Sequence, residues 1–365
     1  MQLTPEQQIL FNLVKISLWP GQDEEVLLSG ITQINWEKII SFASRQGVLG
    51  VSLDGYSGGK KFTDQLPALK KDQQIRWELS LKSQEARNKR QREAIKELVA
   101  LFKENGMEML LLKGIGLSEN YPIPSHRECG DIDIYLYGDH EKGNQIMEAL
   151  GIVVDKQGSK HDNFFFKGIP VENHKTFLDL TSGKINQRLE EHLHKILTEQ
   201  GFDTIRIDDT EVRIPTPDFT AIFLTRHDIT HFVSSGLVLR YLCDLGLFFT
   251  RNASSINFSQ FFNILEETSQ LNLFSAFMNL AQKYLGMPVN SFPALPCDKN
   301  LSNRILQDTI NIPKKIPPED LAKWWIVRRK VVGAFHLFRT KWKYDLMDKG
   351  FFYRRLSFSV LRAFK

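Results

Sequence analysis

The chain has 365 residues, enough for two or three domains or for one domain with a helical extension. Hydrophobic residues make up 42% and charged residues 25%, as in ordinary soluble globular proteins, and no apolar run or N-terminal pattern predicts a membrane span or a secretory signal. Cys129, Cys243 and Cys297 are far apart, which argues against a disulfide scaffold or a cysteine zinc site and favours a reducing cytoplasm.

The net charge of +4 is unevenly distributed along the chain. Residues 321–365 hold twelve Lys and Arg against two Asp, so the basic excess belongs to this tail and the rest of the chain is acidic. A charge asymmetry of this kind predicts an anionic partner for the tail or a solvated helix face.

The N-terminal region is predicted to be helical. Thr4 followed by Pro5 is typical of an N-cap and first helical residue, and this helix is expected to run through Leu18. A second helix is expected over 35–46, and the glycine-rich stretch 55–59 predicts a loop.

The polar run 68–105 predicts one long helix, with Gly106 as its C-terminal stop. Two interpretations of the whole region 1–106 follow. It is either a helical scaffold that packs against a sheet, which we favour, or a lid or recognition module.

The apolar stretch 107–112 predicts a short buried strand. It ends at Lys113 and Gly114, and Gly116 follows, which suits a tight turn into a short helix. Glycine at such a turn lets the backbone approach an anion such as phosphate, although a Gly-x-Gly pattern alone is weak evidence.

Residues 131–137 alternate between polar and apolar side chains. In a strand, this period of two places Asp131 and Asp133 on one face and Ile132 and Ile134 on the other. Two neighbouring carboxylates in an apolar strand are costly unless a cation lies between them. The pattern therefore predicts a divalent metal site.

The segment after this strand is predicted to alternate between helices and short strands. Helices are expected over 139–150 and 185–199; strands are expected over 152–154, 163–167, 171–176, 204–207 and 212–214, the last two forming a hairpin.

Several motifs together resemble a known family. They are LLKG, then YP, then an arginine, then GDIDIYL and a later VENH. The combination is similar to the bacterial nucleotidyltransferases of the DNA polymerase β-like superfamily, in particular the branch described as uncharacterised nucleotidyltransferases. The resemblance covers roughly residues 100–285 and continues into IPTPDFTAIFLTRHDITHF and LVLRYLCDLGLFF, which look like the helical half of that branch.

The resemblance implies roles for individual residues. Asp131 and Asp133 match the family's Asp-x-Asp pair, Gly114 matches its turn, and Glu172 is the best candidate for its third acid, assigned by order and strand context. The wider superfamily has Ser where this chain has Ile115. Candidates for the missing phosphate contact are the two nearest cations, Lys113 and Arg127.

The activity implied by the resemblance is transfer of an NMP group from an NTP to an acceptor, assisted by two Mg²⁺ ions. Asp131 and Asp133 would bridge the ions, and Glu172 would hold the ion at the acceptor and take its proton. Lys113 and Arg127 would meet the triphosphate. His174 lies two residues after Glu172 on the same predicted face, and it either joins the site or has no role there.

The helical half holds a second motif, in which His227 and His231 are four residues apart. Zinc proteases use this spacing, but they need Glu after the first His, where this chain has Asp228, and no third ligand is evident. We therefore expect both histidines to face the cleft or to pack. Arg240 and Asp244 are expected to form a salt bridge within one helix.

Further helices are expected over 258–267 and 271–285, with a proline-rich connector at 288–296. Beyond Pro317, aromatic residues alternate with the basic residues of the tail. This composition fits binding to RNA, contact with an anionic membrane surface, or a docking helix with buried aromatics, and we favour the last.

The sequence thus predicts an α+β protein with a small mixed β-sheet nucleotidyltransferase core. We expect an N-terminal helical region (1–106), the core (107–215), a helical domain (216–316) and a basic aromatic-rich tail (317–365). The predicted activity uses Mg²⁺ and an NTP, and the acceptor is a small molecule, a protein or RNA. The alternative is a noncatalytic, antitoxin-like module that binds a nucleotide or a protein.

Overall fold

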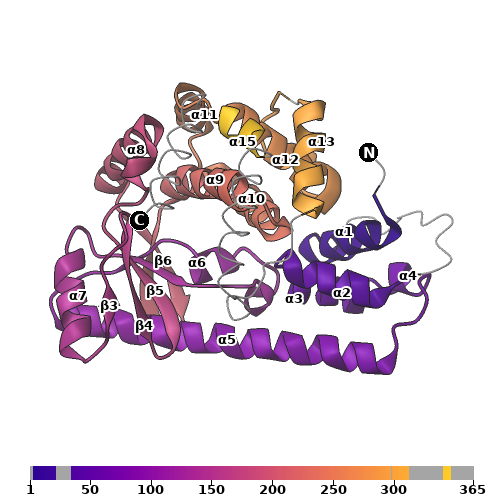
Figure 1. Cartoon of the computed structure of the whole chain (residues 1–365), viewed down its shortest axis with the longest axis horizontal. Helices are drawn as coiled ribbons and strands as arrows, with labels where there is room; N and C mark the ends of the chain where they lie inside the picture. Colours follow the sequence, from indigo (N-terminus) through magenta and orange to yellow (C-terminus); the bar gives the residue numbers. More distant parts are fainter. Residues whose placement is uncertain (1–2, 22–33, 297, 312–339, 347–365) are drawn as a thin grey trace, which may run out of the picture.

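The structure is a computed structural model that describes residues 3–21, 34–296, 298–311 and 340–346. A β-sheet lies at one end of the molecule, a long helix runs beneath it, and two groups of helices complete the body (Figure 1). This architecture confirms the predicted α+β class.

Seven strands form one mixed sheet in the described part of the chain. They are β1 (Leu110–Leu111), β2 (Ile132–Tyr135), β3 (Val154–Asp155), β4 (His161–Phe166), β5 (Ile169–His174), β6 (Phe202–Ile207) and β7 (Thr210–Pro215). The order is β3-β4-β5-β2-β1-β7-β6, with β2 parallel to β5 and β1 parallel to β7. The predicted hairpin is β6 and β7, which are antiparallel.

The two faces of the sheet differ in chemistry, as the alternation in β2 predicts. Ile132 and Ile134 are buried in an apolar core with Leu111. Asp133 lies on the opposite face of β2 because successive side chains of a strand alternate. One face of the sheet therefore supplies packing, and the other supplies ionisable groups.

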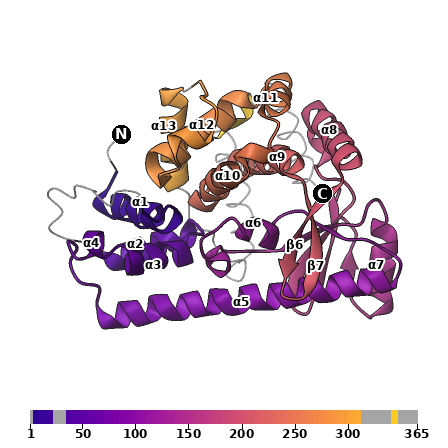
Figure 2. The ribbon, with the colours of Figure 1, turned by 180° about the vertical axis from the view of Figure 1, so that it is seen from behind.

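The predicted long helix is α5 (Lys71–Glu104), which has 34 residues. Its C-terminal half buries Ile95, Leu98 and Phe102 in the core beneath the sheet. Its N-terminal half contacts the N-terminal helices, and there Ile75 and Leu79 are exposed rather than part of a continuous apolar stripe. Figure 2 shows the helix passing from one end of the molecule to the other.

The N-terminal helices are α1 (Pro5–Leu18), α2 (Trp36–Arg45), α3 (Leu49–Gly58) and the single turn α4 (Lys60–Thr63). Thr4 caps α1 through a capping box with Gln7, as predicted from the sequence. Asn35 caps α2.

The prediction of a loop over the glycine-rich stretch 55–59 is mostly wrong, because Gly55 lies within α3. α1 and α3 pack so closely here that a Cβ at Gly55 would lie 1.8 Å from the carbonyl oxygen of Leu13. The glycine therefore serves helix packing, which a local sequence pattern does not distinguish from a turn.

Gly55→Ala is expected to lower the free energy of unfolding by about 1–3 kcal/mol, because the added methyl forces α1 and α3 apart. Urea denaturation measures this change. Gly58→Ala is the matched control, since Gly58 belongs to the same helix and an added methyl there would meet no atom within 4 Å. Equal stability of the two variants would contradict the packing role.

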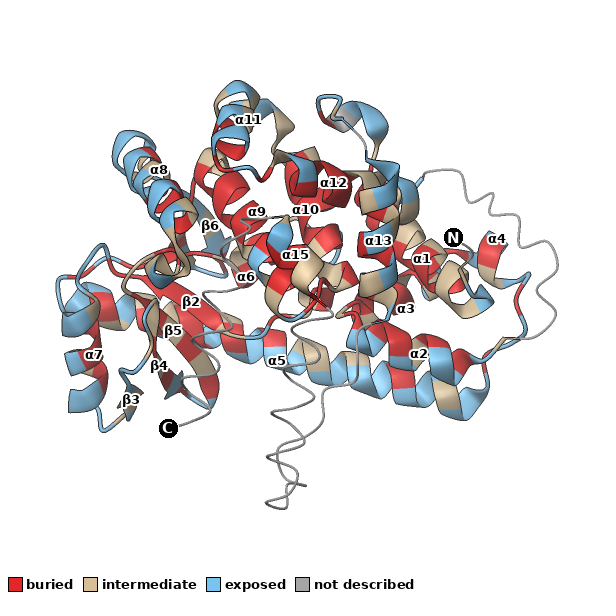
Figure 3. Cartoon of the chain, turned by 45° about the horizontal axis from the view of Figure 1, so that its top comes forward, coloured by how far each residue is buried: buried red, intermediate tan, exposed pale blue. Residues whose placement is uncertain are grey.

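The remaining helices form two sets. Around the sheet lie α6 (Ile115–Ser118), α7 (His140–Ala149) and α8 (Lys184–Gln200). The helical half contains α9 (Pro217–Ser234), α10 (Leu239–Arg251), α11 (Phe258–Glu267), α12 (Leu271–Leu285) and α13 (Lys299–Ile310). Figure 3 shows the buried faces of α9, α10 and α12 turned into this half.

Only a short part of the basic tail is described, as α15 (Lys341–Asp345). Tyr344 is buried there, and the Trp342 ring meets Phe232 of α9 edge-on at 5.6 Å. This segment docks on the helical half, whereas the rest of the predicted tail helix lies outside the described residues. Among the helices that the structure describes, none combines the length and hydrophobicity needed to cross a bilayer.

Candidate active site

The parallel pairing of β2 with β5 brings two acids of the sequence motif to the same level of the sheet. Asp133 and Glu172 are register partners, although they lie far apart in the chain. Asp131 precedes β2 directly and lies on the same side of the strand as Asp133. Carboxylate oxygens of the three residues lie within 4.8 Å of one another.

Burial differs strongly among these acids. The Asp133 side chain has no exposed surface, whereas that of Asp131 is 37% exposed. Burial alone would raise the pKa of Asp133, but Lys113 and His174 beside it hold this pKa well below its ordinary value. Asp133 is therefore an anion, and its Oδ2 atom has no hydrogen-bond partner among the described residues.

Lys113 follows β1 and reaches the acids from the turn at Gly114. Its Nζ atom lies 3.0 Å from Oδ1 of Asp133 and 3.9 Å from Oδ1 of Asp131. Burial opposes its charge, but the surrounding carboxylates raise the pKa of Lys113 above its ordinary value. Gly114 has φ of +72°, a conformation that favours glycine at this turn.

Ile115, which stands in place of the superfamily's serine, begins α6 and is buried in the core between the sheet and α5. Its side chain therefore packs with apolar neighbours such as Leu111. Any contact to a phosphate at this turn has to come from backbone groups or from other residues.

Two basic residues of the site were not predicted from the sequence, and both come from the start of β4. His161 lies with its Nδ1 atom 3.2 Å from Oε2 of Glu172, and Nζ of Lys160 is 4.0 Å from the same oxygen. Burial lowers the pKa of His161 to about 4 and also lowers that of Lys160. His161 is therefore a neutral imidazole at pH 7.

A signal for His161 was present in the sequence. Gly168 lies in the two-residue turn of a hairpin whose closing pair is Phe166 and Ile169. Five residues further from the turn on each strand, the same register pairs His161 with His174. His174 itself is fully buried, with Nε2 3.1 Å from Oδ1 of Asp133. The structure thus brings it into the acidic cluster, next to Glu172.

A pocket of about 480 Å³ separates this face of the sheet from α9. It is lined from the sheet side by Lys113, Asp131, Lys160, His161 and Glu172, and from α9 by Arg226, His227, Thr230 and His231. The pocket has the size of a small-molecule site and joins anionic and cationic groups in one space.

The two histidines of α9 face this pocket, which is one of the two arrangements expected from the sequence. Their Nε2 atoms lie 3.2 Å apart, and the His231 ring stacks on Tyr241 at 5.0 Å. Burial lowers the pKa of His227 well below its ordinary value and that of His231 to about 4. Burial also raises the pKa of Asp228, so this acid is unlike the ionised base of a zinc protease.

The neutral state of His231 predicts a pH-dependent stability. An unfolded histidine takes up a proton below about pH 6.5, whereas the folded one does so only near pH 4. The unfolded state therefore binds more protons in this window, and stability falls as the pH is lowered through it. Between pH 7 and 5, His231 should contribute about 2 kcal/mol to this loss.

Urea denaturation of the wild type and of His231→Gln at both pH values measures this contribution. The loss of stability on acidification should be smaller in the variant. His140→Gln is the control, because His140 lies in α7, outside the residues that line the pocket. An unchanged pH dependence in His231→Gln would show that the folded His231 titrates normally.

The Arg127 side chain, which the sequence suggests as a contact for the triphosphate, has protein partners in the structure. Its guanidinium is buried and binds Asp244 of α10 through two hydrogen bonds, of 2.7 and 2.8 Å. It also donates to the carbonyl oxygen of Gly114 at 3.1 Å, and Tyr121 donates to Asp244. The side chain predicted to meet a triphosphate thus fixes the Lys113–Gly114 turn onto the helical half.

The prediction that Arg240 and Asp244 form a salt bridge is wrong, because each residue has another partner. Asp244 is taken by Arg127 and Tyr121, while Arg240 donates to the backbone oxygen of Glu128 at 2.6 Å. Helical spacing brought the two residues to one face of α10, but stronger tertiary partners were available to each.

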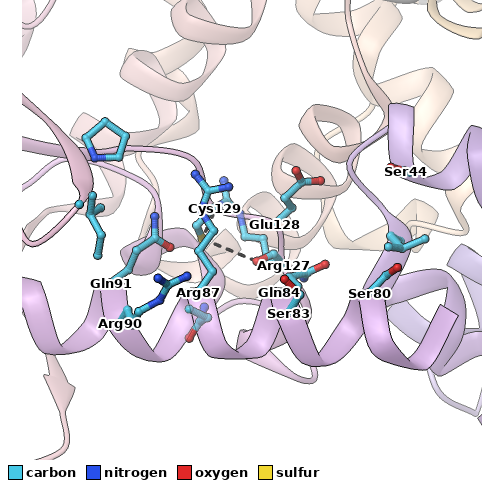
Figure 4. Close-up of a pocket in the computed structure, with 15 residues that line it drawn as sticks. Ser44, Ser80, Ser83, Gln84, Arg87, Arg90, Gln91, Arg127, Glu128 and Cys129 are labelled. Atoms are coloured by element: carbon cyan, nitrogen blue, oxygen red, sulfur yellow. Dashed lines mark hydrogen bonds between the residues drawn. The ribbon is translucent and has the colours of Figure 1, made fainter. Parts of the chain in front are cut away.

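A second pocket, of about 460 Å³, lies along α5 and is also lined by Arg127, Glu128 and Cys129. We call residues 127–130 the Arg127 segment. Figure 4 shows Arg87, Arg90 and Gln91 projecting from the helix toward Glu128 and Cys129. It contains none of the three clustered carboxylates, and its residues hold the segment in place, since Arg87 and Gln91 both donate to the carbonyl oxygen of Gly130. We therefore locate the candidate chemistry in the pocket below α9.

The α+β fold, with a mixed sheet, a Lys-Gly turn and three converging carboxylates, agrees with the class of nucleotidyltransferase-type domains. The more particular assignment comes from a family described as "Uncharacterised nucleotidyltransferase", whose sequence model matches residues 32–286. The match covers well over half of the chain, which therefore belongs to this family. Searches of curated proteins and of solved structures gave no match.

Proposed function

We propose that this protein moves an NMP group from a Mg²⁺-bound NTP to a hydroxyl or similar acceptor, as in the DNA polymerase β-like superfamily. The acceptor oxygen forms a bond to the α-phosphorus, the bond from this phosphorus to the β-phosphate breaks, and pyrophosphate leaves. One observation carries the proposal. Among the described residues, Oδ2 of Asp133 and Oε2 of Glu172 are buried without a hydrogen-bond partner, in a cluster with Asp131 at the wall of a pocket. Buried carboxylate oxygens in this state fit a divalent cation, which prefers oxygen ligands.

In this proposal Asp131 and Asp133 hold two Mg²⁺ ions, and Glu172 holds the ion nearer the acceptor. When bound, the ions supply charge stabilisation for the transferred phosphoryl group and lower the pKa of the attacking hydroxyl. Glu172, with its side chain partly open to the pocket, takes the proton from the acceptor.

The cations of the pocket bind the triphosphate. Lys113 stays charged beside the acids, and Lys160, the residue before β4, lines the pocket. Both present ammonium groups, which bind phosphate oxygens as point charges. Since Arg127 is held by Asp244, we assign the role that the sequence suggested for it at the triphosphate to Lys160. His174 orients Asp133 through their 3.1 Å contact.

The acceptor, whether a small molecule, a protein or RNA, enters between the sheet and α9, because this helix forms the facing wall of the pocket. The basic tail beyond 317 is proposed as a contact for an anionic partner. Cys129 and Cys243 are buried free thiols, in accord with the cytoplasm as the proposed compartment.

The test uses the full-length protein, Mg²⁺ and each α-³²P-labelled NTP with a cell lysate that is afterwards separated into RNA, protein and small-molecule fractions. We expect the label in one fraction, which identifies the acceptor class. Binding of NTP that needs Mg²⁺ but leads to no transfer would instead support the noncatalytic module. Absence of metal-dependent NTP binding would contradict the proposed function.

A further inference from the structure

One group of side chains at the site combines nitrogen with oxygen. His161 of β4 and His174 of β5 are register partners, and Glu172 lies on the same face of β5. The Nδ1 atom of His161 is 3.2 Å and the Nε2 atom of His174 is 3.5 Å from Oε2 of Glu172. The three ligand atoms lie within 4.8 Å of one another.

These close contacts leave two of the atoms unsatisfied. Nδ1 of His161 and Oε2 of Glu172 are buried, but their orientation does not allow a hydrogen bond, and neither has another partner within the described residues. Buried polar atoms are almost always paired in folded proteins. In the tautomer of His161 whose Nδ1 carries the lone pair, two adjacent and unpaired lone-pair atoms indicate a cation that both atoms share.

The hydrogen bonding of His174 fixes which nitrogen it presents. Its Nδ1 atom lies 3.2 Å from the carbonyl oxygen of Thr176 and must donate, since a carbonyl only accepts. The Nε2 atom faces Asp133 and Glu172, and it donates to Oδ1 of Asp133 at 3.1 Å, because an ionised carboxylate only accepts. A metal ion would displace this proton, and Nε2 would then present its lone pair to the ion. Metal-binding histidines are commonly oriented by such a bond from their other nitrogen to a backbone carbonyl.

The mixture of ligands decides which cation fits. Mg²⁺ prefers oxygen and binds imidazole poorly, whereas first-row transition metals accept imidazole and carboxylate together. Three protein ligands also leave coordination positions open for water or substrate.

We propose that His161, His174 and Glu172 bind a first-row transition-metal dication. This refines the proposed function: the transition metal takes the acceptor-side position in place of the second Mg²⁺. The inference rests on the proposed function only in naming this the acceptor side. It divides the site into an oxygen position at Asp131 and Asp133 and a nitrogen-containing position at β4 and β5, which share Glu172.

The test uses Co²⁺ as the probe, with full-length protein freed of metal by a chelator and without nucleotide. Co²⁺ has visible absorption bands that change when imidazole replaces water. We expect one Co²⁺ to bind with such bands, and His161→Ala to weaken its binding by at least about tenfold. Mg²⁺ should compete poorly with Co²⁺ at this position.

His192→Ala is the matched control, because His192 lies on α8 and pairs with Glu267 at 3.7 Å. Pulsed EPR of Mn²⁺-loaded protein gives a second readout, since a coordinated ¹⁴N nucleus modulates the signal. This measurement uses the wild-type protein. It therefore still tests whether nitrogen binds the metal if the second ligand variant, His174→Ala, does not fold because His174 is buried.

The inference is overturned if His161→Ala binds Co²⁺ as the wild type does and Mn²⁺ shows no nitrogen coupling. This result differs from failure of the proposed function. A protein that binds Co²⁺ through His161 and transfers no NMP keeps the metal site and loses the activity. A protein that transfers NMP with Mg²⁺ alone and lacks nitrogen coupling would keep the proposed function and contradict the transition-metal site.

Discussion

Asp133→Asn should strongly weaken metal-dependent NTP binding and NMP transfer. Asp133 is the fully buried member of the acidic cluster, and its Oδ2 atom has no partner among the residues that the structure describes. Loss of a residue that only supports a metal ligand typically costs 10- to 100-fold in affinity or activity. Removal of the charge of a ligand itself should therefore reduce transfer at least about 100-fold, measured with labelled NTP at saturating Mg²⁺.

Asp155→Asn is the matched control, because Asp155 is an exposed residue on the edge strand β3. The variant should bind and transfer as the wild type does. Asp133→Asn also leaves Lys113 with a weaker partner, so its folding must be checked by circular dichroism. A folded Asp133→Asn protein with wild-type transfer would remove Asp133 from the metal site.

Arg127→Ala is expected to destabilise the protein by about 3–5 kcal/mol, because it leaves the buried carboxylate of Asp244 without its counter-charge. The side chains of Arg127 and Asp244 are only 5% and 1% exposed, so water does not replace the lost bonds. Urea denaturation measures the effect. NTP affinity of the fraction that stays folded should change little.

Tyr121→Phe provides the graded control. It removes a single hydrogen bond to the same carboxylate and should cost about 1–2 kcal/mol. If Arg127→Ala were instead as stable as the wild type but lost NTP affinity, the arginine would contact the triphosphate, as the sequence suggests.

The sequence predicted those parts of the site that depend on local periodicity. The alternation around Asp131 and Asp133 indicated a strand with an acidic face, and the order of predicted strands led to Glu172, which the structure places beside Asp133. The long helix and the β6–β7 hairpin were predictable for the same reason, because period and turn residues are local signals.

The parts that the sequence did not predict depend on contacts between distant residues. Arg127 and Asp244 are 117 positions apart, and no local pattern indicates that they meet. His161 joins the site through the register of two strands, and Gly55 serves the approach of α1. Each is decided by tertiary packing, which outweighs the local preference of the residue.

The placement of α5 has a consequence for how substrates bind. It contacts α2 and α3 at one end and the sheet at the other, while α1 packs on α12 and α12 on α9. The two walls of the pocket are thus joined through a closed circuit of packed helices. The two walls are already in place in the folded protein, so NTP binding does not have to bring them together. NTP should therefore associate without a slow domain closure.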